Sequence, residues 1–357
     1  MSVSPGPRTP GPGPRALVFG YHTMGCVGFD ALTRHDFEIA AVFTHADDPH
    51  EEVWWGSLAD RAGARGIPVH RPEKVDLKSD TVTELIASYR PDFIFSFYFR
   101  WMIPTRVLAL APRGAFNLHG SLLPRYRGRA PVNWVLVNGE TETGVSLHTM
   151  VAKADAGDLV DQERVMIAVE DTALTLYGKL ETAARTMLDR ALPPLRDGQA
   201  HSRPMNLSEG SYFGGRTPED GRFEWSWNAG RIYNLVRAVT HPYPGAFTTW
   251  CDGKLLVWWA VPSRSSAVAP PGTVLAVDLD GITVAVGDGA LRLVTVQLAG
   301  RPELPACAFA LSHEIAPGTT LQGRSSSAPD NGPRTTDPGH SIPARASSRK
   351  PGNGENP

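Results

Sequence analysis

The chain has 357 residues, 41% of them hydrophobic, which is enough for two domains of ordinary size. Its formal net charge of −2 gives no general reason to expect nucleic acid or an acidic membrane as a partner. The three cysteines, Cys26, Cys251 and Cys307, are widely separated and lack metal-ligand spacing. They therefore indicate reduced thiols rather than a disulfide framework or a metal site.

The two ends of the chain differ in composition from the rest. Residues 1–14 are mostly Pro, Gly and Ser and lack the apolar core of a secretory signal. Residues 323–357 contain no aromatic residue and one large aliphatic residue, Ile342, so they bury too little surface to offset the entropy of ordering. We expect both segments to be disordered. No run of about 18 apolar residues is present, so we expect a cytoplasmic protein without membrane insertion.

Between residues 15 and 204, predicted strands alternate with predicted helices. Apolar runs predict strands at residues 16–19, 39–44, 68–70, 93–99, 115–119, 144–150 and 159–169. A glycine turn is predicted over residues 20–28, and a first helix begins at residue 29. Helical spacing predicts further helices at residues 58–66, 81–89, 106–110 and 172–192, the last of which ends at Pro193. This alternation predicts an α/β fold, with a Rossmann-like parallel sheet covered by helices on both faces. Ligands are expected beyond the carboxyl ends of the strands.

After about residue 205 the predicted strands become short and are separated by Gly and Pro. They cover residues 245–250, 255–260, 272–277, 282–286 and 291–297, and a predicted helix at 228–239 precedes them. Short, evenly spaced strands predict a small β-barrel. The expected organisation is therefore an extension (1–14), an α/β domain (15–204), a β-barrel domain (205–322) and a tail (323–357).

Asn117 and His119 are the most informative pair of residues in the α/β region. The period of two in a strand places both side chains on one face. A neutral imidazole exchanges protons near pH 7, and an amide N–H stabilises an oxyanion, so the pair suits acyl transfer. An isolated Asn-x-His is more often a histidine held by hydrogen bonds at the end of a strand.

The surrounding sequence, Asn117-Leu118-His119-Gly120-Ser121-Leu122-Leu123-Pro124 and on to Pro131, resembles the signature of the formyltransferases that use 10-formyltetrahydrofolate. The likeness continues, in the family order, through residues 138–145 and 154–158. It covers roughly residues 15–322, including an OB-like β-barrel domain at the C-terminal side. The resemblance implies a formyltransferase that takes 10-formyltetrahydrofolate as co-substrate and uses no metal.

The resemblance also implies three catalytic residues: Asn117, His119 and Asp155. An amine that attacks a formyl carbon must lose a proton, and His119 is placed to handle it, which typically contributes about 10²–10⁴ in rate. Asn117 would donate to the oxyanion, and Asp155 would stabilise the cationic imidazole. Taken alone, Asp155 is typical of a loop carboxylate that caps a turn.

For the folate, the family pattern implies eight binding residues. They are Trp101, Met102, Ile103, Arg129, Val151, Ala152, Lys153 and Ala154. A flat pterin needs an apolar slot with backbone donors and acceptors at its rim, which residues 101–103 would supply just past a strand end. Without the resemblance, that tripeptide is equally typical of ordinary core, and Arg129 of a solvated side chain.

Three further segments, residues 21–26, 134–139 and 213–218, resemble one subgroup of the family, the formyltransferase half of the bifunctional polymyxin-resistance enzyme. That half formylates UDP-4-amino-4-deoxy-L-arabinose in lipid A modification, so a UDP-aminosugar is the implied small-molecule partner. Its second, decarboxylating dehydrogenase domain has no counterpart in the tail of this chain. We therefore expect the formyltransferase alone, and leave open a separate dehydrogenase partner and the oligomeric state. Arg216 would contact the sugar nucleotide or, as we prefer, join the two domains.

Other functions remain as alternatives. Methionyl-tRNA formyltransferase shares the signature, but residues 206–322 carry eight Lys or Arg against ten Asp or Glu, which disfavours a nucleic-acid partner. A nicotinamide-dependent oxidoreductase would need glycines two residues apart, whereas Gly20 and Gly25 are five apart. A non-catalytic binding module is disfavoured because all three catalytic positions are filled. The closest alternative is a formyltransferase for another nucleotide-linked aminosugar.

Overall fold

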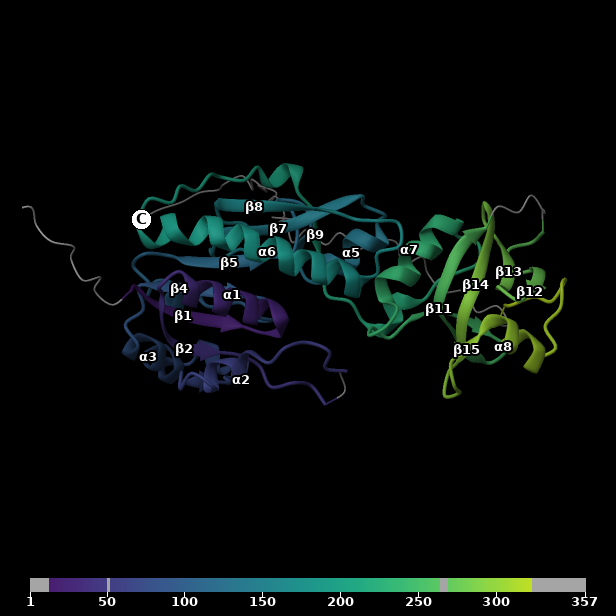
Figure 1. The fold of residues 1–357 in the computed structure, drawn as a ribbon, viewed down its shortest axis with the longest axis horizontal. Helices are drawn as coiled ribbons and strands as arrows, with labels where there is room; N and C mark the ends of the chain where they lie inside the picture. The colour runs from purple at the N-terminus through teal and green to yellow at the C-terminus, as the bar shows by residue number, and fades with distance from the viewer. Residues whose placement is uncertain (1–12, 50–51, 264–268, 323–357) are drawn as a thin grey trace, which may run out of the picture.

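The computed structural model describes residues 13–49, 52–263 and 269–322, which form two domains placed along the long axis of the molecule (Figure 1). The predicted tail (323–357), and all but the last two residues of the predicted extension (1–14), lie outside the described residues. None of the helices in the described part of the chain combines the length and apolar character needed to cross a lipid bilayer.

The N-terminal domain is built on a seven-stranded sheet in the order β3-β2-β1-β4-β5-β7-β8. The strands are β1 (Arg15–Gly20), β2 (Glu38–Phe43), β3 (Val69–His70), β4 (Phe93–Phe97), β5 (Ala115–His119), β7 (Glu142–Thr149) and β8 (Leu159–Met166). The sheet is parallel from β3 to β5, as predicted, and β7 and β8 extend it as antiparallel strands. The carboxyl ends of β1, β4 and β5 therefore meet at one edge.

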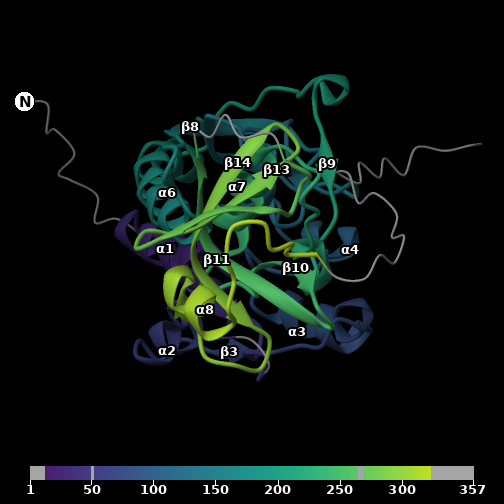
Figure 2. The ribbon, with the colours of Figure 1, turned by 90° about the vertical axis from the view of Figure 1, so that its right-hand side faces the viewer.

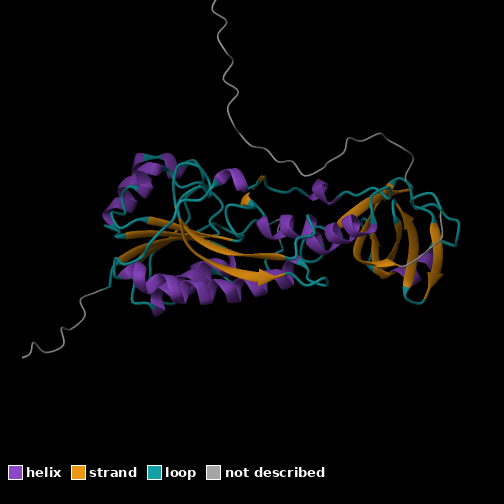
Figure 3. Ribbon diagram, turned by 90° about the horizontal axis from the view of Figure 1, so that it is seen from above, coloured by secondary structure: helices purple, strands orange, loops and turns teal. Residues whose placement is uncertain are grey.

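Helices cover both faces of this sheet (Figure 3). They are α1 (His22–Arg34), α2 (Leu58–Gly63), α3 (Asp80–Ser88), α4 (Thr105–Leu108), α5 (Pro131–Val137) and α6 (Ala173–Arg196), with a short 3₁₀ turn η1 (Asp76–Lys78). Neighbouring residues of β1 separate the two layers: Val18 belongs to the core under α1 and α6, and Leu17 to the core with α3 and α4. This alternation is the period of two expected for a strand buried on both faces.

Helix α1 begins at His22, so the predicted glycine turn over residues 20–28 was wrong. Gly25 and Gly28 lie inside the helix, where they allow it to approach its neighbours closely. A Cβ at Gly28 would lie 2.3 Å from ring atoms of Phe97 on β4. In sequence, a glycine that permits close packing looks the same as a glycine that permits a turn.

Helix α6 also differs from the prediction, because it continues through Pro193 and Pro194 to Arg196. Each proline removes a backbone donor from the helix. The apolar face nevertheless stays buried on both sides of them, at Leu192 and at Leu195. Burial of this face holds the last turn in the helical conformation.

The C-terminal domain is an antiparallel sheet in the order β10-β11-β14-β13-β12, with β15 paired to β14 (Figure 2). The strands are β10 (Ala246–Trp250), β11 (Gly253–Ser263), β12 (Val274–Asp278), β13 (Gly281–Val286), β14 (Gly289–Leu298) and β15 (Leu304–Pro305), and helix α8 (Ala306–Ser312) packs beside them. This is the expected C-terminal β domain. Within the described residues no pairing joins β10 to β12, which corresponds to the partly open barrel of OB-like folds.

Helix α7 (Ala229–Val239) lies between the two domains and packs against α5 and β11 (Figure 1). Asn133 Nδ2 of α5 donates to the Ala238 carbonyl oxygen at 2.8 Å. The half-buried Arg216 guanidinium stacks 4.6 Å from the Trp134 ring and donates to the Asp220 carbonyl oxygen at 2.7 Å. Short elements link the domains: β6 (Arg127–Gly128) paired with β9 (Tyr212–Phe213), and the 3₁₀ turns η2 (Leu207–Glu209) and η3 (Pro218–Gly221).

Candidate active site

A cavity of about 410 Å³ opens at the carboxyl ends of β1, β4 and β5. This is where α/β sheets bind ligands, because the chain leaves β1 and β4 in opposite directions along the sheet. All but one of the candidate residues line it: Asn117, His119, Asp155, Trp101, Met102, Ile103, Arg129, Val151, Lys153 and Ala154. Ala152 belongs to the same loop but is exposed and does not line the cavity.

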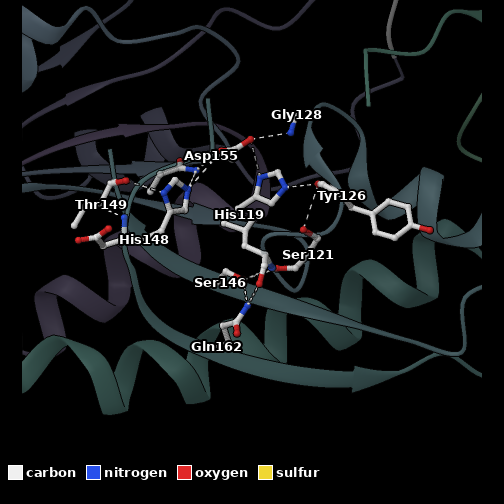
Figure 4. A network of polar contacts seen from close by, with 12 residues as sticks. His119, Ser121, Tyr126, Gly128, Ser146, His148, Thr149, Asp155 and Gln162 are labelled. Atoms are coloured by element: carbon white, nitrogen blue, oxygen red, sulfur yellow. Dashed lines mark hydrogen bonds and ion pairs between the residues drawn. The ribbon is translucent and has the colours of Figure 1, made fainter. Parts of the chain in front are cut away.

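The three predicted catalytic side chains converge in this cavity. Asn117 and His119 lie on β5, and Asp155 lies in the loop after β7. Figure 4 shows the His119 ring beside the Asp155 carboxylate. His119 Nδ1 is 3.6 Å from Asp155 Oδ2, and Asn117 Nδ2 donates to Asp155 Oδ1 at 3.4 Å. The strand period and the family pattern therefore identified side chains that contact one another.

A left-handed backbone conformation, with φ of 48°, directs the Asp155 carboxylate into the site. Residues other than Gly rarely adopt it, although Asp is among those that tolerate it best. The backbone N–H of Gly128 donates to Asp155 Oδ2 at 2.8 Å. Strand β6 thus holds the carboxylate from the side opposite β7.

His148 on β7 is a site residue that the sequence analysis missed. It is 1% exposed, and its Nε2 lies 3.1 Å from Asn117 Nδ2 and 3.4 Å from Asp155 Oδ1 (Figure 4). The antiparallel register pairs His148 with Asn117 across β5 and β7. A histidine in the middle of a predicted strand was visible in the sequence, but its pairing partner was not.

The hydrogen bonds assign the protons on both imidazoles. His119 Nε2 is 2.7 Å from the carbonyl oxygen of Tyr126, and His148 Nδ1 is 2.8 Å from that of Thr149. Because a carbonyl oxygen only accepts, these two nitrogens carry hydrogens. His119 Nδ1 and His148 Nε2 are the other ring nitrogens, and both face Asp155.

Asp155 is held as an anion. Burial alone would raise the pKa of its carboxyl group. The charge of His119, the hydrogen bond and charge of His148 and the Gly128 N–H together outweigh burial and keep this pKa well below the usual range. A fixed negative charge beside two imidazoles stabilises whichever of them takes up a proton.

A second layer of hydrogen bonds fixes the loop that positions the Tyr126 carbonyl (Figure 4). Ser146 Oγ donates to the Ser121 carbonyl oxygen at 2.6 Å and accepts from the Leu123 N–H at 3.1 Å. Ser121 Oγ in turn lies 3.3 Å from the Tyr126 carbonyl oxygen. The loop is thereby tied to β7, the strand that carries His148.

The proposed folate slot follows β4, which ends where Tyr98 adopts a φ of 58°. Ile103 is buried, whereas Met102 is 55% exposed and Val151, which lines the same cavity, is 41% exposed. Exposed apolar side chains that line a cavity provide a surface for a flat ring. Across residues 13–49, 52–263 and 269–322, no group of three or more His, Cys, Asp or Glu side chains is arranged to hold a metal ion.

Comparison with known families agrees with this geometry. Residues 18–192 match the family described as Formyl transferase, and residues 216–314 match the one described as Formyl transferase, C-terminal domain. The chain belongs to the formyl transferase family. Asn117, His119 and Asp155 lie in the first of the two matched regions.

Solved structures of several enzymes share the fold. HypX from Aquifex aeolicus, in complex with tetrahydrofolic acid, has a TM-score of 0.57 at 19% identity over 84% of this chain, which spans about half of HypX (47%). An N-formyltransferase from Helicobacter canadensis, bound to folinic acid and dTDP-3-aminofucose, has a TM-score of 0.59 at 17% identity, over 78% of this chain and 98% of that one. WlaRD, a sugar 3N-formyl transferase, has a TM-score of 0.58 at 17% identity, over 82% of this chain and 100% of that one.

Proposed function

We propose that this formyltransferase transfers the formyl group of 10-formyltetrahydrofolate to the amine of a nucleotide-linked aminosugar, and that its acceptor is UDP-4-amino-4-deoxy-L-arabinose. The observation that carries the proposal is the contact of Asn117, His119 and Asp155 within one cavity. Those residue types meet the needs of formyl transfer to an amine, which are an oxyanion donor, a proton acceptor and a fixed anion.

In the proposed reaction, the lone pair of the acceptor amine forms the new bond to the formyl carbon, and the carbonyl electrons move to oxygen. His119 Nδ1 takes the proton that the amine releases, and Asp155 stabilises the resulting imidazolium. Asn117 Nδ2 donates to the oxyanion, for which its long 3.4 Å bond to Asp155 is readily given up. The oxyanion then collapses, the bond to N10 of the folate breaks, and N10 takes up the proton that His119 holds.

Two observations support a nucleotide-linked aminosugar over tRNA as the acceptor. The acidic balance of residues 206–322 repels a polyanion. The Helicobacter canadensis relative was solved with dTDP-3-aminofucose, which is an acceptor of this chemical class. UDP-4-amino-4-deoxy-L-arabinose is favoured within the class because residues 21–26, 134–139 and 213–218 resemble the subgroup that uses it.

The test is an acceptor assay with the full-length protein and 10-formyltetrahydrofolate. UDP-4-amino-4-deoxy-L-arabinose, dTDP-3-aminofucose and methionyl-tRNA are offered separately, and mass spectrometry detects the added formyl group. We expect formylation of the first acceptor alone. Formylation of dTDP-3-aminofucose instead would keep the proposed acceptor class but contradict UDP-4-amino-4-deoxy-L-arabinose as the acceptor. Formylation of methionyl-tRNA would overturn the proposed acceptor class.

A further inference from the structure

A cavity of about 420 Å³ lies at the junction of the two domains, between α5, the η3 turn and the start of α7 (Figure 1). The residues that line this interdomain cavity include Trp134, Asn138, Arg216, Arg222, Trp227 and Arg231. None of the described residues lines both this cavity and the catalytic one. Its volume is within the range of small-molecule sites, which often lie between domains. The reaction described above does not use it.

Positive charge is concentrated around the interdomain cavity. Arg216 precedes η3, Arg222 directly follows η3, and Arg231 lies in the first turn of α7. Helix α7 also begins here, because its N-cap residue Asn228 and the next-turn residue Gly230 line the cavity. The N-terminus of a helix carries a partial positive charge, which adds to that of the three guanidinium groups.

The two carboxylates that line the same cavity bind partners of their own. Glu219 forms an ion pair with Lys254 of β11. Asp220 Oδ2 accepts from the backbone N–H of Thr217 at 2.6 Å and from its hydroxyl group at 3.0 Å. Neither carboxylate therefore forms an ion pair with the arginines of the cavity within the described residues.

The charge of Arg216 is not balanced by a neighbouring anion. The ion pairs of the described residues include one between Arg222 and Glu224, at 3.2 Å, but none that involves Arg216. Arg216 donates instead to a neutral acceptor, the Asp220 carbonyl oxygen. Burial lowers the pKa of Arg216, and the charge of Asp220 offsets this effect only in part. A half-buried cation in this situation gains stability from an anionic ligand.

Two of the guanidinium groups are held in place by tryptophan rings. Arg216 stacks 4.6 Å from the Trp134 ring, and Arg231 stacks 3.5 Å from the Trp227 ring. A guanidinium presents its N–H groups in a planar fork that matches carboxylate or phosphate oxygens. Stacking fixes the plane of this fork before a ligand binds, which reduces the entropy cost of binding.

The number of arginines favours phosphate over carboxylate. A phosphate monoester carries about −1.5 to −2 charge at pH 7 and three acceptor oxygens, whereas a carboxylate carries a single charge and two oxygens. We propose that the interdomain cavity binds a small molecule through a phosphate group held by Arg216 and Arg231. This site is separate from the catalytic cavity and does not depend on the identity of the formyl acceptor.

The experiment measures the Kd of inorganic pyrophosphate for the full-length protein by isothermal titration calorimetry. Arg216→Gln and Arg231→Gln each remove one guanidinium from the interdomain cavity. Each is expected to weaken pyrophosphate binding about 10- to 100-fold, as for the loss of a hydrogen bond to a charged group. Arg129→Gln removes a guanidinium that lines the catalytic cavity, so this matched control should leave the Kd of pyrophosphate unchanged.

Both test variants should keep the wild-type Kd of 5-formyltetrahydrofolate, which shows that they are folded. Pyrophosphate binding that is absent in the wild type, or unchanged in both test variants, would overturn the proposal. Equal affinity of the wild type for citrate would overturn the choice of phosphate. If a variant does not fold, a wild-type crystal soaked with pyrophosphate decides: density in the interdomain cavity supports the proposal, and density only elsewhere overturns it.

Discussion

Asn117 on β5 and His148 on β7 lie opposite each other in an antiparallel pair, with Asn117 Nδ2 3.1 Å from His148 Nε2. Asp155 lies 3.4 Å from each of these two nitrogens. His148 therefore orients the amide that is proposed to stabilise the oxyanion and shares its carboxylate partner. We assign it a positioning role, since its Nδ1 is committed to the Thr149 carbonyl oxygen.

His148→Ala is expected to lower kcat by about 10- to 100-fold, because a buried partner of Asn117 and Asp155 is lost. A positioning role predicts that this effect is not additive with Asn117→Ala in a double-mutant cycle. The exposed His201 gives the matched control, His201→Ala, with unchanged turnover. Fully additive effects in the cycle would exclude coupling between His148 and Asn117.

His119→Ala is expected to lower kcat by about 10²–10⁴, the usual contribution of a general base. Asn117→Ala is expected to lower it by about 10²–10³, as for the loss of an oxyanion donor. Asp155→Ala should also lose most turnover, since it removes the anion between the two imidazoles. Circular dichroism and folate binding confirm that each variant is folded, and near wild-type turnover in any one removes that residue from the mechanism.

The sequence predicts that Asn117 and His119 share one face of a strand, because that information is local. The period of two in a five-residue strand is enough to place Asn117 and His119 on one face. His148 was not predicted, because its role depends on the pairing of β7 with β5. Helix α5 separates these strands in the chain, and neither strand alone encodes their pairing. The contribution of the Tyr126 carbonyl is likewise set by loop geometry rather than by residue type.

Glycines set another limit to prediction. Gly25 and Gly28 indicated a turn, whereas the structure uses them for close packing of α1. Gly28→Ala is therefore expected to reduce the free energy of unfolding by about 1–3 kcal/mol, because its Cβ would overlap the Phe97 ring at 2.3 Å. Urea titration followed by circular dichroism measures the change.

The matched control is Gly178→Ala in α6, where, apart from the helix's own backbone and the adjoining residues, no atom of the described residues lies within 4 Å of the added Cβ. It should raise the free energy of unfolding by about 0.5–1 kcal/mol, since Ala is the better helix former. Equal effects of the two substitutions on the free energy of unfolding would show that close packing of α1 against Phe97 does not require a glycine at position 28.

The buried imidazole of His45 predicts how stability depends on pH. His45 has a pKa of about 4 in the folded protein and about 6.5 when unfolded, so below pH 6.5 the unfolded chain binds a proton that the folded protein does not. The stability that neutral His45 permits is therefore fully present above pH 6.5. It is lost as the pH falls toward 4, because protonation of His45 favours the unfolded chain. Between pH 7 and pH 5 this loss amounts to about 1–2 kcal/mol.

His45→Gln removes that titration, so urea unfolding of the variant should show a smaller fall in stability from pH 7 to pH 5 than the wild type shows. The comparison uses the difference between the two pH values, which cancels any destabilisation that the substitution itself causes at both. His201→Ala, which removes an exposed histidine, should leave the wild-type difference intact. An identical fall in the wild type and in His45→Gln would mean that folding does not lower the pKa of His45.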